Sequence, residues 1–340
     1  MSVPEIQDEV ITLCQAGHAL ALCGGVEQAL REYERALALD PRCAPALFNR
    51  GTLLLRSDRA TEALECFEHL AAMAPAIGAV HLARGNALAA LGRQASALAC
   101  FEEAIRCEPA ELLAHCNRGN ALVALGRAPE ALASLDRAAA LAPANALVRY
   151  NRGNALLALT RYAEALADFD IVVQADPRFV LAWYNRGSAL LELCRHADAV
   201  ASFERVVALA PDYAPAHNNR GAALLCLKRR TEAIEAFEQA LRLQPGYDGA
   251  LENLGKAFHH LARFDEAARC FGALAAASPE RPYALGNLLD AQARCCDWGG
   301  DYPTVRARVA DAVARGQRVQ FPFAFLATCD SAAAQLECAR

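Results

Sequence analysis

Small, aromatic and helix-breaking residues recur along the chain with a single period of 34 residues. Glycines occupy positions 17, 51, 85, 119, 153, 187, 221 and 255, and prolines occupy 41, 75, 109, 143, 177, 211, 245 and 279. Alanines recur at 29, 63, 97, 131, 165, 199, 233 and 267. Four residues after each alanine comes a bulky apolar side chain: Tyr33, Phe67, Phe101, Leu135, Phe169, Phe203, Phe237 or Phe271. Several residue types that share one period indicate an array of repeated structural units.

Each unit is predicted to be two antiparallel helices. A glycine inside the first helix costs about 1 kcal/mol relative to alanine, so its repetition indicates a close approach of another helix. We expect the repeated alanine to lie opposite it, and the ring to fill the space between units one turn further along. The proline ends the second helix and opens the next unit. Leu91-Gly92-Arg93 and Leu125-Gly126-Arg127 are predicted turns between the two helices.

With these positions in place, the chain resembles the tetratricopeptide repeat family, as in NRGNALLALTRYAEALADFDIVVQADP from Asn151 to Pro177. The resemblance implies an all-α, right-handed superhelical solenoid of helix-turn-helix repeats, in which the first helices line a concave groove that binds peptides. Each repeat then contacts its neighbours rather than one central core. We expect an N-terminal lead-in at 1–9 and eight repeats at 10–281. Residues 282–340 are expected to form a partial ninth repeat, a capping helix and a connector.

Asparagine recurs two residues before the glycine in six of the eight repeats, on the predicted inner helix: Asn49, Asn117, Asn151, Asn185, Asn219 and Asn253. An Asn amide both donates and accepts hydrogen bonds. Adjacent helices pack roughly 8–10 Å apart and three extended residues span about 10 Å, so this column fits the backbone of an extended polypeptide. The alternative is that these amides bond a neighbouring helix and specify packing; both roles can hold at once.

Two further sets of residues are predicted to line the groove. One residue after the glycine lies a shorter asparagine column: Asn86, Asn120 and Asn154. Aromatic residues near the main column, among them Tyr150 and Tyr184, are predicted to select side chains of the bound peptide.

Two other repeated positions have a structural interpretation. An arginine precedes the glycine in six repeats, and an acidic residue follows the bulky apolar position in seven, so we expect ion pairs between helices. Contact of these arginines with a ligand is the alternative. His81, His115 and His217 share one phase and are expected to be packed or to line the groove, because residues on successive helices are too far apart to ligate one metal ion.

Charge and composition narrow the classes of partner. Lys and Arg total 34 and Asp and Glu total 39, which gives a net charge of −5, and no basic run occurs. Nucleic acid and anionic membranes are therefore not expected partners. The N-terminus is acidic and every apolar stretch is interrupted by charge, so we expect a cytoplasmic protein. The 14 cysteines include no CxxC pair and are expected to be reduced structural thiols.

The C-terminal segment carries a second resemblance. The element Cys296-Asp297-Trp298, an amphipathic helix and the stretch Pro322-Phe323-Ala324-Phe325-Leu326 resemble the connector of bacterial protein O-GlcNAc transferase relatives. That family also uses an asparagine ladder to hold its substrate polypeptide. The resemblance covers only the non-catalytic half of the family.

Two functional hypotheses follow. The first is a non-enzymatic scaffold that binds extended polypeptide through the Asn column. The second is the substrate-recruiting half of an O-GlcNAc transferase-like enzyme, in which UDP-GlcNAc enters only if a catalytic domain is supplied elsewhere. No nucleophile–base pair, paired carboxylates or metal spacing is apparent, so no catalytic residue, metal site or cofactor is predicted for this chain.

Overall fold

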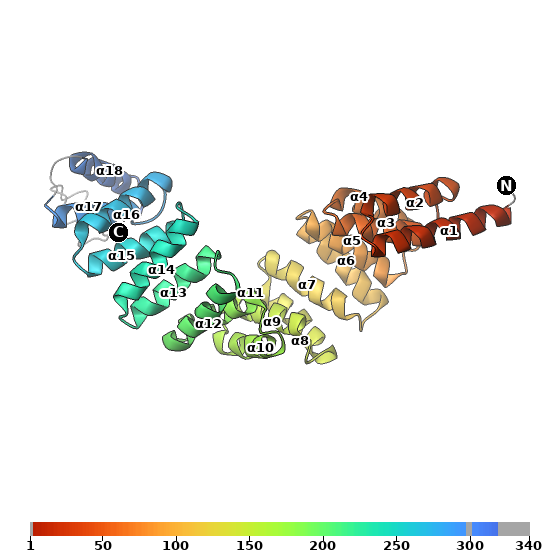
Figure 1. The fold of residues 1–340 in the computed structure, drawn as a ribbon, viewed down its shortest axis with the longest axis horizontal. Coiled ribbons are helices and arrows are strands. Elements are labelled where there is room, and N and C mark those ends of the chain that lie inside the picture. Colours follow the sequence, from red (N-terminus) through yellow and green to blue (C-terminus); the bar gives the residue numbers. More distant parts are fainter. Residues whose placement is uncertain (1–2, 297–300, 319–340) are drawn as a thin grey trace. The chain divides into compact units, whose positions relative to one another are not determined.

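The computed structural model describes residues 3–296 and 301–318. Every regular element in these residues is an α-helix, and the chain divides into two compact units, Met1–Asp176 and Pro177–Arg340. Successive helices form antiparallel pairs joined by short turns (Figure 1). The predicted all-α fold of helix-turn-helix repeats is confirmed. The connector residues Asp297, Trp298 and Pro322–Leu326 lie outside the described residues.

The first unit contains ten helices within its described residues. They are α1 (Val3–Leu22), α2 (Val26–Leu39), α3 (Ala44–Arg56), α4 (Ala60–Met73), α5 (Gly78–Ala90), α6 (Gln94–Cys107), α7 (Leu112–Ala124), α8 (Ala128–Leu141), α9 (Ala146–Ala158) and α10 (Tyr162–Ala175). Because α1 begins at Val3, most of the segment predicted as a lead-in is helical.

The second unit contains eight helices within its described residues. They are α11 (Val180–Glu192), α12 (His196–Leu209), α13 (Ala214–Cys226), α14 (Arg230–Leu243), α15 (Asp248–His260), α16 (Phe264–Ala277), α17 (Ala284–Arg294) and α18 (Tyr302–Ala314). The segment predicted to hold a partial repeat and a cap contains α17 and α18. Helix α17 packs against α16, and α18 packs against α17. The backbone N–H of Tyr283 donates to the carbonyl of Arg318 at 2.8 Å, which ties the start of α17 to the residues after α18.

First and second helices lie in different layers of each unit. The first helices of successive pairs pack directly on one another, α1 on α3, α3 on α5, α5 on α7 and α7 on α9 in one unit, and α11 on α13 and α13 on α15 in the other. No comparable packing joins the second helices of neighbouring pairs within the described part of either unit. The first helices therefore form an inner layer in which successive repeats meet, and within each unit every second helix also packs on the first helix of the next pair.

The repeated glycine packs against the bulky side chain of its own helix pair. A Cβ on Gly85 would lie 2.5 Å from Cε1 of Phe101, and one on Gly119 would lie 2.5 Å from Cγ of Leu135. The sequence interpretation placed the repeated alanine opposite the glycine and the ring between units, and this was wrong. The ring fills the space that the missing Cβ leaves, and it is excluded from solvent there, with Phe101 only 1% exposed.

The turn between the two helices of a pair requires a left-handed residue. Gly92 has φ +72° and Gly126 has φ +73°, which confirms the two predicted turns. In later repeats the same position is held by residues with a Cβ, among them Thr160 at φ 57° and Cys194 at φ 57°. A β-branched residue such as threonine is strained in this conformation.

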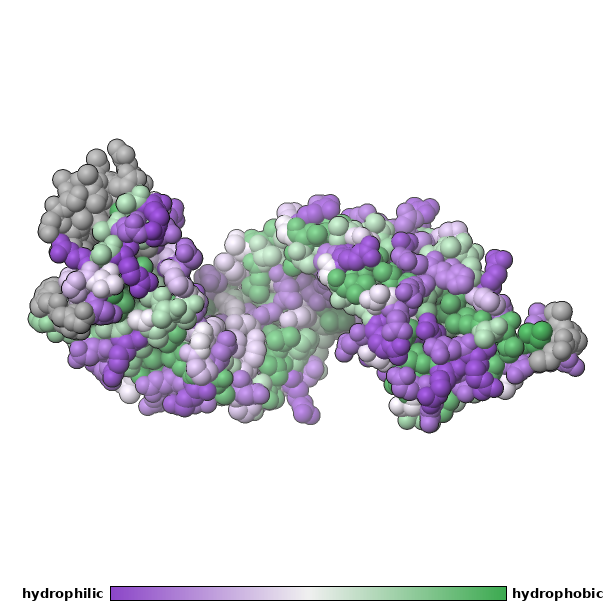
Figure 2. Space-filling model, turned by 90° about the horizontal axis from the view of Figure 1, so that it is seen from above, coloured by the Kyte–Doolittle hydropathy of each residue, from purple (hydrophilic) through white to green (hydrophobic). Residues whose placement is uncertain are grey.

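Hydrophilic and hydrophobic side chains are interspersed over the face of the described residues that Figure 2 shows. The large exposed apolar side chains include Ile11 and Leu22 of α1, at 55% and 75% exposure. None of the helices in the described residues combines the length and apolar character that a membrane span requires.

Candidate functional site

The six asparagines of the main predicted column all lie on first helices. Asn49 is on α3, Asn117 on α7 and Asn151 on α9, while Asn185, Asn219 and Asn253 are on α11, α13 and α15. Asn151 is buried, with 7% of its surface exposed, and the others are half-buried. All six amides therefore belong to the inner layer of first helices.

In the first unit, the two predicted asparagine columns meet at a hydrogen bond. Nδ2 of Asn117 on α7 donates to Oδ1 of Asn86 on α5 at 2.7 Å. Of the other residues in the shorter column, Asn120 is exposed and Asn154 is half-buried. The bond between Asn117 and Asn86 joins consecutive first helices, as the packing interpretation expects.

In the second unit, a chain of hydrogen bonds crosses three first helices. Nδ2 of Asn253 on α15 donates to Oδ1 of Asn218 at 3.0 Å, and Nδ2 of Asn218 donates to Oδ1 of the adjacent Asn219 at 3.0 Å. Nδ2 of Asn219 then donates to the hydroxyl oxygen of Tyr184 on α11 at 3.0 Å. We call this set of four residues the amide relay.

Sequence reasoning missed Asn218 as a member of the site. It lies three residues before the glycine, where other repeats hold Phe48, Tyr150 or Tyr184. Still other repeats hold Cys14, Leu82, Cys116 or Glu252 there, so the position varies and Asn218 gives no periodic signal. The period alone does not show that this position reaches the next helix.

Tyr184 anchors one end of the amide relay among other rings. Its ring makes edge-on contacts with Phe203, at a centroid distance of 5.8 Å, and with Tyr213, at 5.4 Å. Burial, together with the nearby Tyr213 and Tyr247, raises the pKa of the Tyr184 hydroxyl to about 12. The hydroxyl is therefore a neutral hydrogen-bonding group at physiological pH.

Tyr150 occupies the equivalent position in the first unit. Its ring lies 6.1 Å from that of Phe169, in a tilted arrangement. Both predicted tyrosines thus pack on the ring of their own helix pair, and both remain half-buried rather than fully covered.

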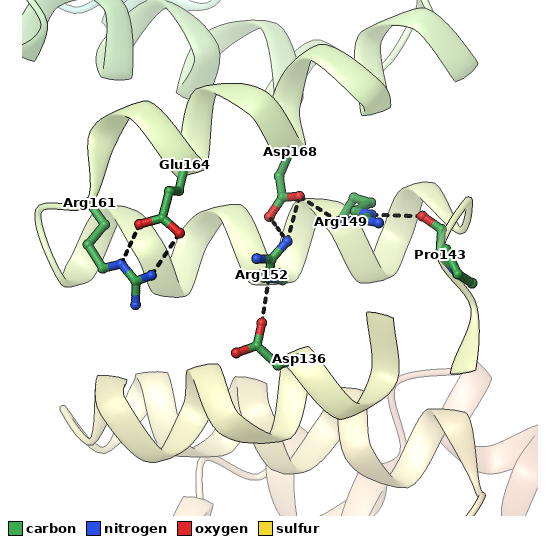
Figure 3. A network of polar contacts seen from close by, with 7 residues as sticks. All are labelled: Asp136, Pro143, Arg149, Arg152, Arg161, Glu164 and Asp168. Carbon is green, nitrogen blue, oxygen red and sulfur yellow. Dashed lines mark hydrogen bonds and ion pairs between the residues drawn. The ribbon is translucent and has the colours of Figure 1, made fainter. Parts of the chain in front are cut away.

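The repeated arginines form the predicted ion pairs between helices. Arg152 on α9 donates from Nε to Asp136 on α8 at 2.7 Å and from Nη1 to Asp168 on α10 at 3.0 Å (Figure 3). Arg149 also donates to Asp168, at 3.0 Å. Asp168 is 2% exposed, and burial raises the pKa of its carboxyl against the lowering effect of Arg152 and Arg149.

Equivalent arginines in other repeats make the same two contacts, with a smaller side chain at the position of Asp168. Arg50 contacts Glu34 at 3.2 Å and donates to Sγ of Cys66 at 3.1 Å, while Arg118 contacts Glu102 at 3.2 Å and donates to Ser134. Each arginine therefore joins the second helix of the preceding pair to the second helix of its own pair. The prediction of structural ion pairs is confirmed for Arg50, Arg118 and Arg152.

The three histidines of one phase bond the loop before their own helix. Nε2 of His81, His115 and His217 lies 2.7, 3.0 and 2.9 Å from the carbonyl oxygens of Pro75, Pro109 and Pro211. In the same phase Trp183 donates to Pro177 at 3.1 Å and Arg149 donates to Pro143 at 2.7 Å. All three histidines are buried, which is the packed role predicted for them. Within the described residues, no three His, Cys, Asp or Glu side chains are grouped so as to hold a metal ion.

A cavity of about 540 Å³ lies beside α1 and α3 in the first unit. Its lining is mostly apolar and includes Val10, Leu22 and Pro45, together with Gln15 and Asn49, which belong to the phase of the main asparagine column. The predicted column thus begins at the wall of this cavity.

Comparison with known proteins agrees with the repeat structure. Sequence models of the tetratricopeptide repeat match residues 16–77, 150–214, 184–248 and 224–294, and a TPR repeat model matches 85–126 and 119–160. No curated protein matches the sequence.

Solved structures share the fold. A tetratricopeptide repeat protein from Parabacteroides merdae ATCC 43184 is 18% identical, with a TM-score of 0.57 over 74% of this chain and 99% of its own. The APC/C hetero-tetramer Cut9-Hcn1 is 18% identical, with a TM-score of 0.60 over 78% of this chain and 52% of the matched one. MamA from Desulfovibrio magneticus RS-1 is 27% identical, with a TM-score of 0.48 over 51% of this chain and 97% of its own.

The matched sequence models together span well over half of the chain, and the first two structures share its all-α superhelical repeat fold. The chain belongs to the tetratricopeptide repeat family.

Proposed function

We propose that this chain is a protein-interaction scaffold that holds an extended polypeptide on the inner layer of first helices. The observation that carries the proposal is the amide relay, in which Asn253, Asn218, Asn219 and Tyr184 place polar groups on three successive first helices. No reaction is assigned to the chain, and a cytoplasmic location stays part of the proposal.

The relay leaves hydrogen-bonding capacity for a ligand. An Asn side chain offers two N–H donors and two acceptor lone pairs. Asn219 uses one donor on Tyr184 and one lone pair on the N–H of Asn218, so half of its capacity is not used by these bonds. An extended peptide presents an N–H and a C=O at every residue and matches such alternating groups without regard to its side chains. The bonds between helices also orient the amides, which lowers the entropy cost of binding.

Aromatic side chains supply the selectivity that backbone bonding lacks. Tyr150 and Tyr184 stand next to the column and are only half-buried, so their rings can contact side chains of a peptide. Tyrosine combines apolar area with a polar tip at low conformational cost, which suits a recognition surface.

A peptide array tests the proposal. The full chain is applied to a random peptide array and to the same peptides with N-methylated backbones, which lack backbone donors. We expect binding to many unmethylated peptides and a general loss on methylation, because the proposed contacts are made to the backbone. Binding that survives methylation would show that side chains alone are recognised, and absence of binding to every peptide would contradict the proposal.

A second candidate function is supported by the sequence of the C-terminal segment. Residues Cys296-Asp297-Trp298 and Pro322–Leu326 resemble the connector of bacterial O-GlcNAc transferase relatives, and the asparagine columns resemble the ladder of that family. Under this second hypothesis, the same inner layer recruits polypeptide substrates for a glycosyltransferase domain.

Fusion to a catalytic domain distinguishes the two candidate functions. The chain is fused to the glycosyltransferase domain of a family relative and offered UDP-GlcNAc with array-selected peptides. The recruiting function predicts that these peptides are glycosylated faster than by the catalytic domain alone, and a simple scaffold predicts no gain. Calorimetry with UDP-GlcNAc and the unfused chain is expected to show no saturable heat in either case.

A further inference from the structure

Cys14 and Cys43 bring their thiols together although they lie on different helices and 29 positions apart in the sequence. Their Sγ atoms are 3.7 Å apart. Cys14 is in the middle of α1, and Cys43 is the N-cap residue of α3, just before the helix begins. A disulfide has an S–S length of about 2.05 Å, so the two sulfur atoms need to close by less than 2 Å.

The position of Cys43 makes this closure easier than one between two helix interiors. With φ −65° and ψ 96°, Cys43 is outside the helical conformation, and its carbonyl accepts only the first backbone hydrogen bond of α3, from Leu47 at 3.1 Å. A small change there leaves the rest of the helix in place. On the opposite side, α1 packs on both α2 and α3, which holds Cys14 against its partner.

Both sulfur-bearing residues line the cavity of about 540 Å³ described above. A small molecule in that cavity can therefore approach Cys14, which is half-buried, and Cys43 beside it, which is 9% exposed. Cys66 and Cys100 do not line the cavity and are 3% and 5% exposed. The remaining lining is mostly apolar, with His18 the titratable side chain next to Cys14 on the same helix face.

We propose that Cys14 and Cys43 form a dithiol site that exchanges with small-molecule disulfides and closes into a disulfide between α1 and the start of α3. The inference is independent of the proposed scaffold function. It revises the expectation that all the cysteines serve only for packing.

The exchange proceeds in two balanced steps. One protein thiolate attacks a sulfur of the small disulfide, forms a mixed disulfide and releases one small thiolate. The second protein thiolate then attacks the protein-bound sulfur, forms the bond between Cys14 and Cys43, and releases the second small thiolate. The two protons lost by the protein thiols are taken up by the two released thiolates. The protein pair is oxidised and the small disulfide is reduced.

The environment of the two thiols slows thiol–disulfide exchange at this site. Burial, and then the contact with Cys43, raises the pKa of the Cys14 thiol to about 12. Because the thiolate is the attacking species, such a thiol reacts slowly at neutral pH. The thiol of Cys226 is exposed and serves as a reference for exchange.

The disulfide would change the end of the array. It closes a loop that contains the rest of α1 and all of α2, and it pins α1 to α3 beside Gln15 and Asn49. Opening of the first helix pair then requires movement of α3 as well.

Mass spectrometry of the full chain tests the site. A Cys23→Ser background is used, because Cys14 and Cys23 otherwise share one tryptic peptide. The protein is incubated with oxidised glutathione, remaining thiols are alkylated, and trypsin fragments are mapped. We expect the peptide that contains Cys14 to be joined to the peptide that contains Cys43, with a loss of two hydrogen atoms, while Cys226 carries glutathione. A reductant should restore both peptides.

A matched variant and a structural readout complete the test. In Cys43→Ser the joined peptide is absent, and limited proteolysis of α1 is as fast after glutathione treatment as before. In the Cys23→Ser background the same treatment should slow cleavage of α1 several-fold. If Cys14 and Cys43 are recovered alkylated, or each with its own glutathione, after an incubation many times longer than Cys226 needs for full exchange, the proposal is overturned.

Discussion

Asn117 on α7 donates a hydrogen bond to Asn86 on α5, with 2.7 Å between Nδ2 and Oδ1. The two residues come from different predicted columns, one two positions before the repeated glycine and the other one position after it. The columns are therefore one polar surface at this junction, and the bond serves packing whatever else the amides bind.

A double-mutant cycle on this pair measures the packing role. Asn86→Ala and Asn117→Ala are expected to show a coupling energy of about 1 kcal/mol in urea unfolding, as for a typical hydrogen bond. If the amides also hold polypeptide, Asn117→Ala lowers peptide affinity of the protein that remains folded. Asn145→Ala is the control, because Asn145 caps α9 through Leu147 and lies outside both columns. A coupling near zero would mean that the bond contributes nothing to stability.

The helix pairs were predictable because their signals are local and steric. A glycine where a ring must fit, a proline that stops a helix and a small turn residue each act within one repeat, and the period of 34 repeats them. The partner of the glycine was mispredicted because periodicity gives the face of a helix but not the reach of a side chain. Phe101 extends far enough to cover Gly85, which a small alanine does not.

Contacts made by residues that differ from repeat to repeat were harder to predict. Asn218 stands at a position that varies between repeats, and its role depends on the amide of Asn253, in the next repeat, lying within hydrogen-bond distance. Arg149 and Asp168 both depart from the side chains of the preceding repeat, His115 and Ser134, in the same unit. This joint departure was visible in the aligned repeats, but the contact between the two positions follows only from the packing of α9 against α10.

Substitution of Gly85 tests the close packing of the ring. In Gly85→Ala the new Cβ would lie 2.5 Å from Cε1 of Phe101, so the ring or the backbone has to shift. The variant is expected to lose about 1–2 kcal/mol of stability, since overpacking outweighs the better helix propensity of alanine. Gly246→Ala is the matched control, because nothing lies within 4 Å of a Cβ there. Equal urea midpoints for the two variants would contradict the packing argument.

Thr160 offers a stabilising substitution. Its φ of 57° is strained for a β-branched residue, and Gly92 and Gly126 hold the same position in earlier repeats. Thr160→Gly is expected to gain about 0.5–1 kcal/mol, because relief of strain exceeds the entropy that glycine adds to the unfolded chain. The reciprocal variant Gly126→Thr should lose stability. Thermal unfolding monitored by circular dichroism checks both signs, and a loss in Thr160→Gly would show that the turn carries no strain.

Alkaline titration tests the environment of Tyr184. Its pKa is raised to about 12 from 10.0. Between these values the unfolded chain loses the proton and the folded chain keeps it, so the free energy of unfolding falls as pH rises through this window. Tyrosinate absorbance of the folded protein should lose its step near pH 12 in Tyr184→Phe. In Asn219→Ala the step should move higher, because the phenolate loses a donor. An unchanged titration in both variants would place Tyr184 outside the relay.

We predict that the ion pairs of the buried Asp168 carboxylate with its two arginines contribute to the stability of the fold. Asp168→Ala removes an acceptor shared by Arg149 and Arg152, whose side chains are 19% and 22% exposed. Arg149 then loses its acid, while Arg152 keeps its pair with Asp136. We expect a loss of about 2–4 kcal/mol, toward the lower end of what breaking a buried pair costs, because both arginines keep some contact with water.

The neighbouring repeat indicates how this loss can be reversed. There Nε2 of His115 lies within hydrogen-bond distance of the loop carbonyl of Pro109, and Arg118 donates to Ser134, which stands at the position equivalent to Asp168. The double variant Arg149→His/Asp168→Ser reproduces that arrangement around Arg152 and should unfold within about 1 kcal/mol of the original chain, whereas Asp168→Ser alone leaves Arg149 without its acid and should be less stable. Urea unfolding of the original chain, of Asp168→Ser and of the double variant measures the differences in the free energy of unfolding. Equal losses in the single and double variants would mean that Arg149 and Asp168 do not act as a pair, and that Asp168 stabilises the repeat through Arg152 alone.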